Sequence, residues 1–407
     1  MRRINAKYPT LFSLYIAQSI PMSFFSTVVP VIMREENYSL ESIGLLQLIK
    51  LPWIFKFLWA PFIDNHTRSK KQLRNWIIAS ELFYAAVIMS IGLFDLQTDF
   101  KLIIGLLLLA FSASATQDIA TDIFAIYILK KKERSVGNSI QSAGSFIGSL
   151  FGTGVLLIAY HHFGWTWLLV CLALCVAFAI IPIMRYRKPI HIAPKGNQNI
   201  SFLEIGRFFS DHVLRRRVVL LVFYYSGIIG ILSMLKPYLV DLGYNAKEIG
   251  FMSGIVGTTV ATLSSLSAGL VIRKIGKRTS FYGFLALGLL AALFFYSLPA
   301  VPALWQVYIG ICLLWGSYGF MSVIIYTSSM DSVRQHREGT DFTLQIVITH
   351  LSSIIIAILS GKIGDALGYK GLFGLEIILI SFTFFILLFI VPPGRKRAIK
   401  MLRRDHQ

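Results

Sequence analysis

The sequence predicts an all-α integral membrane protein with twelve transmembrane helices in two six-helix bundles. Of its 407 residues, 55% are hydrophobic and only 14% are charged, whereas roughly a quarter of the residues in a soluble domain are charged. The apolar stretches run to about 20 residues, which suits membrane-spanning helices and is too long for the alternating strands of a membrane β-barrel. Motifs of the first half recur in the second half, which indicates two related bundles.

Twelve apolar spans follow one another along the chain. With the amino terminus inside, the cytoplasmic segments hold 31 of the 39 Lys and Arg residues, and the outer loops hold four. The positive-inside rule requires this asymmetry, so both termini are expected in the cytoplasm. The net charge of +19 therefore needs no nucleic-acid partner, because the basic residues lie between the spans. The predicted spans are residues 11–33, 42–63, 76–96, 102–129, 137–160, 165–184, 218–240, 247–271, 279–298, 303–328, 341–364 and 369–392.

A long basic segment divides the chain into three parts. We expect an N-terminal six-helix bundle at residues 1–190, a cytoplasmic linker at 191–217 and a C-terminal six-helix bundle at 218–407. Within the linker, apolar and charged residues alternate over 200–211, which is typical of an amphipathic helix lying on the inner leaflet. The three arginines at 215–217 are expected to bind anionic lipid headgroups.

Charged residues inside the second and fourth spans are the main candidate functional residues. Asp118 and Asp122 are four residues apart and therefore share one face of a helix. A carboxylate facing lipid costs at least ~2.5 kcal/mol near the bilayer centre, so this face is expected to line a substrate or proton pathway. Lys56 is the available counter-charge. The alternatives are a structural polar cluster that holds the helices together, and a lysine that snorkels to the headgroups.

Other polar residues are weaker candidates. Glu81 is expected to cap the third span or to pair with Arg74, and His350 to be a packing residue. The three cysteines lie in apolar runs and indicate neither a disulfide nor a metal site. The sequence contains no nucleophile–base set, metal cluster or phosphate-binding loop, so we expect neither an enzyme nor a cofactor.

Internal repeats support the division into two halves. Gln141 and Gln345 are related by an offset of 204, as are Gly164 and Gly368. The loop after the second span contains Ala60-Pro61-Phe62-Ile63-Asp64 followed by Arg68, and the loop after the eighth span contains Gly269-Leu270-Val271-Ile272-Arg273 followed by Gly276 and Arg278.

The second of these loops resembles the Gly-x-x-x-Asp-Arg-x-Gly-Arg-Lys signature of the major facilitator superfamily, with Arg273 where the family has Asp. The resemblance implies that family's fold, with a substrate cavity between the two halves. It also implies a cytoplasmic gate in which Asp64 is held near the end of a helix from the other half. The accompanying gate residues would be Arg68, Arg273 and Arg278.

Three further stretches are similar to one branch of that superfamily, the peptide–acetyl-CoA transporter family of AmpG-like muropeptide permeases. They are Leu51-Pro52-Trp53…Lys56-Phe57-Leu58-Trp59-Ala60-Pro61, Gln117-Asp118-Ile119-Ala120-Thr121-Asp122 and Glu133-Arg134…Gly137-Asn138-Ser139…Gln141. The resemblance implies a permease of cell-wall muropeptides. The chain has no room for the two additional spans of longer members, and the family also contains siderophore permeases and acetyl-CoA carriers.

These observations predict a proton-coupled secondary importer that works by alternating access, as a monomer, in the bacterial inner membrane. Asp118 and Asp122 are expected to take the proton or to contact the substrate, with Lys56 as their counter-charge. Neutral hydrogen bonds to sugar hydroxyls or peptide amides are expected from Gln117, Gln141 and Gln345. The cargo implied by the resemblance is an N-acetylglucosaminyl-anhydro-N-acetylmuramyl peptide. A siderophore, acetyl-CoA or other organic-anion permease remains the alternative, as does a membrane sensor that transports nothing.

Overall fold

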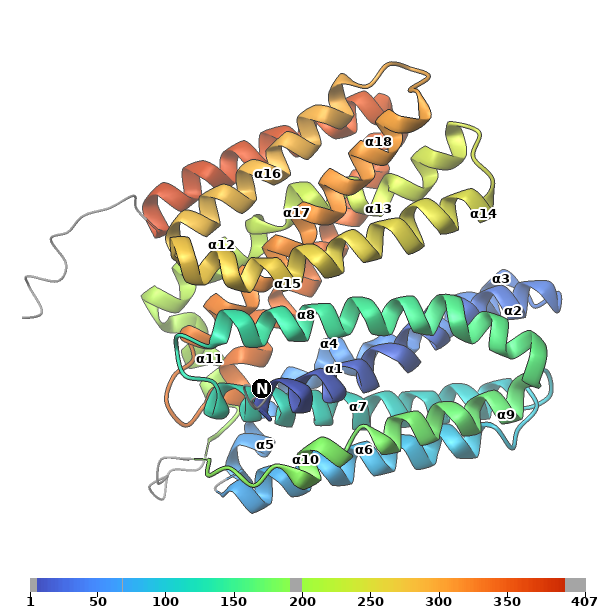
Figure 1. Ribbon diagram of the computed structural model, residues 1–407, viewed down its shortest axis with the longest axis vertical. Coiled ribbons are helices and arrows are strands. Elements are labelled where there is room, and N and C mark those ends of the chain that lie inside the picture. Colours follow the sequence, from blue (N-terminus) through green and yellow to red (C-terminus); the bar gives the residue numbers. More distant parts are fainter. Residues whose placement is uncertain (1–5, 68, 191–199, 392–407) are drawn as a thin grey trace, which may run out of the picture.

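The computed structural model describes residues 6–67, 69–190 and 200–391, and within these ranges every regular element is a helix. Figure 1 shows two groups of long helices, one built by α1–α10 and the other by α12–α18, with the short helix α11 near one end of both groups. This arrangement agrees with the predicted all-α fold.

The first group contains five long helices, α1, α6, α7, α8 and α9, and several short elements. Its elements are α1 (Lys7–Ser23), η1 (Phe24–Val28), α2 (Val29–Glu35), α3 (Leu40–Leu46), η2 (Gln47–Lys50), α4 (Leu51–Phe55), η3 (Lys56–Leu58), α5 (Ala60–Asn65), α6 (Lys70–Ile91), α7 (Phe100–Ile128), α8 (Arg134–Leu150), η4 (Phe151–Val155), α9 (Leu156–Phe178) and α10 (Ile181–Arg185).

The connecting helix and the second group complete the described chain. Their elements are α11 (Leu203–Ser210), α12 (His212–Tyr224), α13 (Ser226–Asp241), α14 (Ala246–Ile249), η5 (Gly250–Gly257), α15 (Thr258–Ile275), α16 (Lys277–Ser297), α17 (Leu304–Asp331) and α18 (Glu338–Ile390).

Helical segments long enough to cross a membrane make up most of the described chain. Eight segments of the described residues have the necessary length and apolar composition. Two of them, Arg134–Arg185 and Glu338–Ile390, contain 52 and 53 residues and each covers two of the predicted spans. The second predicted span is the broken series α3–α5, and the third is α6. The protein is therefore a multi-pass membrane protein.

The two longest segments bend at glycines that occupy equivalent positions in the two halves. Gly164 has φ 70° and ψ −179°, and Gly368 has φ 67° and ψ 179°. A side chain would strain the backbone in this region, whereas glycine adopts it freely. The offset of 204 seen in the sequence thus corresponds to the same backbone turn in each half.

The second predicted span is interrupted where Lys56 lies. Pro52 lies in the first turn of α4, a short 3-10 helix covers Lys56–Leu58, and Pro61 lies in the first turn of α5. Proline lacks the amide hydrogen that continues a helix, so each proline favours a new start. The interruption leaves Lys56 facing the protein interior, with 1% of its surface exposed.

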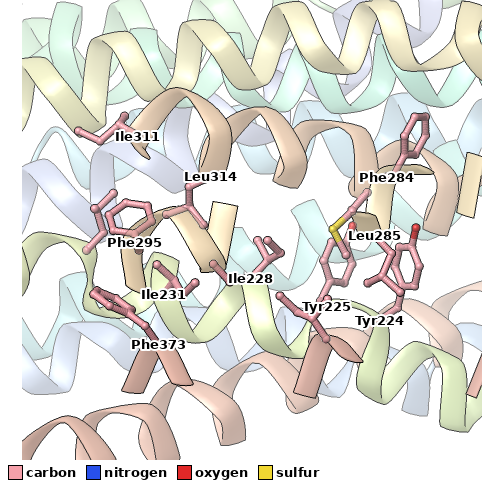
Figure 2. Close-up of a cluster of buried hydrophobic side chains, with 14 of the residues drawn as sticks. Tyr224, Tyr225, Ile228, Ile231, Phe284, Leu285, Phe295, Ile311, Leu314 and Phe373 are labelled. Carbon is pink, nitrogen blue, oxygen red and sulfur yellow. The ribbon is translucent and has the colours of Figure 1, made fainter. Parts of the chain in front are cut away.

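The core of the second group is built from large apolar and aromatic side chains. Figure 2 shows part of this cluster, which contains Tyr224 and Ile228 together with Phe284 and Leu285 of α16. Phe373 of α18 packs at the other end of the cluster with Phe295. Because lipid is as apolar as these side chains, close packing and dispersion hold such a bundle together more than exclusion of water does.

The linker helix α11 is held against the second group by ion pairs and by one buried aromatic side chain. Glu204, 3% exposed, forms ion pairs with Arg207, Arg334 and Arg337 at 2.5, 3.2 and 2.5 Å. Phe208 is fully buried and packs with Leu344 of α18. The linker helix therefore contacts the second group directly, in addition to any contact with the inner leaflet.

Arg217 differs from the expectation that the arginines at 215–217 bind lipid headgroups. Its guanidinium donates to Gln345, to Ser328 Oγ at 2.8 Å and to Ser329 Oγ at 3.2 Å. These three oxygen acceptors are supplied by α17 and α18, so protein groups take the place that the headgroups were expected to fill. Arg216, by contrast, is exposed.

Candidate functional site

A cavity of about 250 Å³ lies between the two groups of helices. Most of its polar lining comes from α1, the broken second span, α7 and α8, and the remainder comes from α17 and α18. Its lining residues include Tyr15, Gln18, Trp53, Lys56, Asp118, Asp122, Gln141, Ser145, Tyr326, Ile346 and His350. Charged side chains from two predicted spans thus meet at the wall of one cavity.

The structure brings Lys56 and Asp118 together as an ion pair. Both side chains are nearly fully buried, with 1% and 7% of their surfaces exposed. The ammonium also lies 4.7 Å from the ring centroid of Trp53, a distance at which the ring face attracts a cation. Ion pairing makes the burial of both charges tolerable, since removal of either partner would leave an uncompensated charge.

Asp122 lies one helical turn further along α7, beside a different partner. Tyr15 donates a hydrogen bond to its Oδ1 at 2.7 Å, and 2% of the residue is exposed. Among the described residues, no Lys, Arg or His nitrogen lies within 4.0 Å of this carboxylate. The two aspartates of one helix face are therefore distinct, because Asp118 is neutralised by a lysine and Asp122 is held by a hydroxyl.

The three glutamines predicted to contact substrate lie in three different surroundings. Gln141 lines the cavity. Gln117 is 1% exposed and accepts a hydrogen bond from Gln18, which itself lines the cavity. Gln345 is fully buried and accepts from Arg217, while its amide donates to Asp341 O at 3.1 Å. Only the first of the three belongs to the cavity wall.

Asp64 joins the two halves at the end where the cytoplasmic loops are predicted. Its carboxylate accepts from the backbone N–H of Gly339 at 2.9 Å, from that of Thr340 at 2.7 Å and from Thr340 Oγ1 at 2.6 Å. These donors belong to the first turn of α18, where unpaired N–H groups and the helix dipole favour a negative charge. This is the arrangement that the resemblance implied for Asp64.

A second junction between the halves lies nearby and uses residues that were not predicted. Arg134 at the start of α8 donates to Asp331 Oδ1 and to Met330 O, at 2.8 and 2.7 Å. Lys277 forms an ion pair with the same aspartate. Ser135 donates to Gly269 O at 3.0 Å. Together with Asp64, these contacts close the predicted cytoplasmic end.

Two other predicted gate residues, Arg273 and Arg278, take no part in these contacts. Arg273 is exposed at the end of α15, and neither it nor Arg278 forms an ion pair with a described residue. Gly276, with φ 85°, turns the chain so that the next residue, Lys277, is the one that reaches Asp331. Arg68 lies outside the described residues.

Several residues of the cavity and its closure escaped the sequence reasoning. Tyr15 and Gln18 are three residues apart in the first span, and this spacing on one helix face was the available signal. Arg134 belongs to one of the stretches that carried the family resemblance, but it was not recognised as half of an ion pair. Tyr326 lies in a span where no periodicity indicated the cavity side, and His350, which was expected to be a packing residue, lines the cavity.

Two helical groups that surround a charged cavity and are joined at one end define the class of membrane transporters that move small molecules. The chain belongs to the Major Facilitator Superfamily, whose sequence model matches residues 11–357. Members of this family transport small molecules and are not enzymes.

Similar proteins include members of the branch of the superfamily that the sequence predicted. The chain is 25% identical over 271 residues to the anhydromuropeptide permease of Escherichia coli (strain K12), a match that covers 65% of this chain and 55% of that protein. It is 22% identical over 400 residues to the putative transporter AmpG 4 of Rickettsia felis, with 93% and 95% covered. Among solved structures, that of FucP, a Major Facilitator Superfamily transporter in the outward conformation, has a TM-score of 0.72 at 14% identity, covering 95% of this chain and 99% of FucP.

Proposed function

We propose that this protein is a proton-coupled secondary importer that moves cell-wall muropeptides into the cytoplasm by alternating access. The observation that carries the proposal is the charged cavity wall formed by the Lys56–Asp118 ion pair and Asp122. The name of the E. coli relative supports the choice of cargo. In this account the protein is a monomer of the bacterial inner membrane, with no enzymatic activity and no cofactor.

The contacts at the predicted cytoplasmic end support inward transport. Asp64 and Arg134 tie the halves together at the predicted cytoplasmic ends. Substrate therefore enters from the outside, and its release requires these contacts to break. A substrate shifts the equilibrium between two such states only by as much as it binds them differently.

Asp122 is the group in the cavity best placed to couple a proton to this change. No lysine or arginine of the described chain neutralises it directly, and Tyr15 supplies its hydrogen bond. Protonation would remove its charge and leave the Lys56–Asp118 pair as the remaining ionic contact of the wall. The change in charge alters how the wall attracts a cationic or hydroxylated substrate group.

The remaining wall suits a sugar-containing peptide. Gln18 and Gln141 offer amide groups for hydroxyls and peptide bonds, and Trp53 and Tyr326 offer aromatic faces. The cavity of about 250 Å³ is smaller than the ~300–1,000 Å³ pockets that enclose drug-sized ligands. A muropeptide would therefore need the cavity to widen on its outer side.

The test is uptake of labelled anhydro-muropeptide into proteoliposomes under an imposed pH gradient, with and without a protonophore. Accumulation that collapses with the protonophore supports both the cargo and the energy source. Folded protein that takes up no muropeptide would contradict the cargo assignment, and a panel of ferric siderophores and acyl-CoA compounds would then be measured. Accumulation that survives the protonophore would contradict proton coupling.

A further inference from the structure

A further buried acid of the N-terminal half, Glu81, lies behind the cavity. Glu81 of α6 has 1% of its surface exposed. It does not pair with Arg74, as its sequence position had suggested, and among the described residues no cationic group lies within 4.0 Å of its carboxyl group. Neither of its oxygens meets a described donor at hydrogen-bonding distance and angle.

The groups around Glu81 are neutral. Helix α6 packs against α7 and α9. From α7, the amide of Gln117 lies beside the carboxyl group, and Ser114 lies beside Tyr84, the nearest titratable neighbour on α6 itself. The charged residues of α7 in this region, Asp118 and Asp122, face the cavity instead. The buried residues of α9 are all apolar: Leu168, Leu169, Leu172, Ala173 and Val176.

An ionised carboxylate in these surroundings would be strongly unfavourable. Burial of a charge without a partner costs several kcal/mol even after the protein relaxes, and such a group takes up a proton instead. Glu81 therefore holds a proton in the conformation described here. The proton would leave only when water or a cation reaches the carboxyl group.

A polar route connects Glu81 to the cavity. Gln18 lines the cavity and donates to Gln117, whose amide lies next to Glu81. Along the same side of α7, the hydroxyl groups of Ser114 and Thr121 are buried and have hydrogen-bonding capacity to spare, as has the Tyr84 hydroxyl of α6. Buried polar groups of this kind are ordinarily satisfied by ordered water.

We propose that Glu81 is a second proton-binding site of the transport cycle, exchanging its proton with the cavity along Gln117 and Gln18. In the deprotonation step the O–H bond of the carboxylic acid breaks, water on this route accepts the proton, and the carboxylate remains. The proposal rests on the proton coupling proposed above, and it adds a site that is not part of the cavity wall.

The first experiment compares the accumulation ratio of Glu81→Gln with that of the wild type in proteoliposomes. Each coupled proton supports at most about tenfold accumulation per unit of pH gradient, since one unit is a tenfold difference in proton concentration. Glu81→Gln is expected to accumulate about tenfold less than the wild type at a gradient of one unit, by the same relation, while substrate exchange without a gradient continues. An unchanged accumulation ratio would overturn the proposal.

Glu376→Gln is the matched control. Glu376 is also a fully buried intramembrane acid, but it belongs to α18 and accepts a hydrogen bond from Ser360 at 2.7 Å, away from the cavity wall. It should accumulate substrate as the wild type does. A similar loss in both variants would show a general effect of removing buried acids and would contradict a specific role for Glu81.

The second experiment requires no transported substrate and therefore separates this proposal from the choice of cargo. Infrared spectra of the reconstituted protein are expected to contain a carboxylic C=O band near neutral pH that is absent from Glu81→Gln and shifts in heavy water. Spectra of the wild type and Glu81→Gln that coincide would show that Glu81 is ionised, and this outcome would overturn the proposal even if muropeptide uptake is observed. The band would persist if only the cargo assignment is wrong.

Discussion

The two walls of the cavity differ in chemistry although they come from halves related by an internal repeat. The wall from the N-terminal half carries Lys56, Asp118 and Asp122. The wall from the C-terminal half carries aromatic and hydroxyl groups, and continues into an adjoining hollow of about 40 Å³ lined in part by Tyr225, Tyr318, Ser322, Tyr326 and Thr349. In the mechanism proposed above, the N-terminal half therefore performs the proton chemistry, while the C-terminal half supplies shape and neutral contacts.

Two glutamines at equivalent positions of the repeat illustrate how the halves differ. Gln141 and Gln345 have the same place in the repeat, yet Gln141 faces the cavity and Gln345 is held by Arg217. Arg217 donates a hydrogen bond to the side-chain oxygen of Gln345, whereas the side-chain oxygen of Gln141 meets no donor among the described residues. Equivalent positions in the fold therefore do not imply equivalent roles. Gln141 is a wall residue, whereas Gln345, beside Arg217, is a packing residue.

The largest expected effect comes from removing the unpaired charge of the N-terminal wall. Asp122→Asn retains an oxygen that can accept from Tyr15 but can no longer take a proton. We expect this variant to lose accumulation against a gradient while it still exchanges substrate across the membrane. The control is Glu376→Gln, which also replaces a buried acid by its amide but lies away from the cavity wall, and it should accumulate normally. Normal accumulation by Asp122→Asn would mean that the charged wall does not perform the coupling.

The next effect concerns stability. Asp118→Leu leaves Lys56 buried without a partner, and breaking a buried ion pair in this way costs about 3–5 kcal/mol. Because an apolar pair of similar volume is often as stable as the ion pair, Lys56→Met combined with Asp118→Leu should recover most of the melting temperature. The double variant should still fail to accumulate substrate. A double variant no more stable than Asp118→Leu would show that the ion pair is not the cause.

Closure at the cytoplasmic end depends on one charge of the N-terminal half. Asp64→Ala removes three hydrogen bonds to the start of α18. Hydrogen bonds to a charged group contribute about 1.5–3 kcal/mol, so the population of the open end should rise about tenfold or more. Spin labels at Lys131→Cys and Arg273→Cys, in a background without the native cysteines, would measure the distance across this end. An unchanged distance distribution would contradict the role of Asp64 as a latch.

The sequence was sufficient for the fold and for part of the site. Long apolar runs and the placement of basic loops predicted the membrane helices, and the cost of a membrane carboxylate drew attention to Asp118, which lies beside Lys56 in the structure. The sides of the helices that meet were harder to predict, because faces that contact lipid and faces that contact protein are both apolar. The cavity position of Tyr326 in α17 and the Arg134–Asp331 ion pair depend on which helix faces meet, and the sequence did not indicate those faces.

A smaller effect is expected from the linker helix, which ties itself to the C-terminal half. Burial alone would raise the pKa of Glu204, but hydrogen bonds from Arg337 and Arg207 outweigh it and lower that pKa below its usual 4.5. The stabilisation is thus fully present above pH 4.5 and is lost as the pH falls through the lowered pKa. Glu204→Gln should lower the melting temperature slightly at neutral pH, and its melting temperature should fall less on acidification than that of the wild type. Equal falls in melting temperature on acidification would exclude this group.

The smallest effect distinguishes the two related glutamines and tests the comparison directly. Gln141→Ala removes a neutral hydrogen bond from the cavity wall, which is worth about 0.5–1.5 kcal/mol, and should raise the KM for substrate by about two- to tenfold. Gln345→Ala instead takes an acceptor from Arg217 at a distance from the wall, so it should lower the melting temperature and leave KM unchanged. If both variants change KM equally, the two halves contribute alike to binding, and the difference between the walls does not extend to substrate recognition. If only Gln141→Ala changes KM, the substrate is bound by residues of the cavity wall, and equivalent positions in the repeat do not contribute equally to binding.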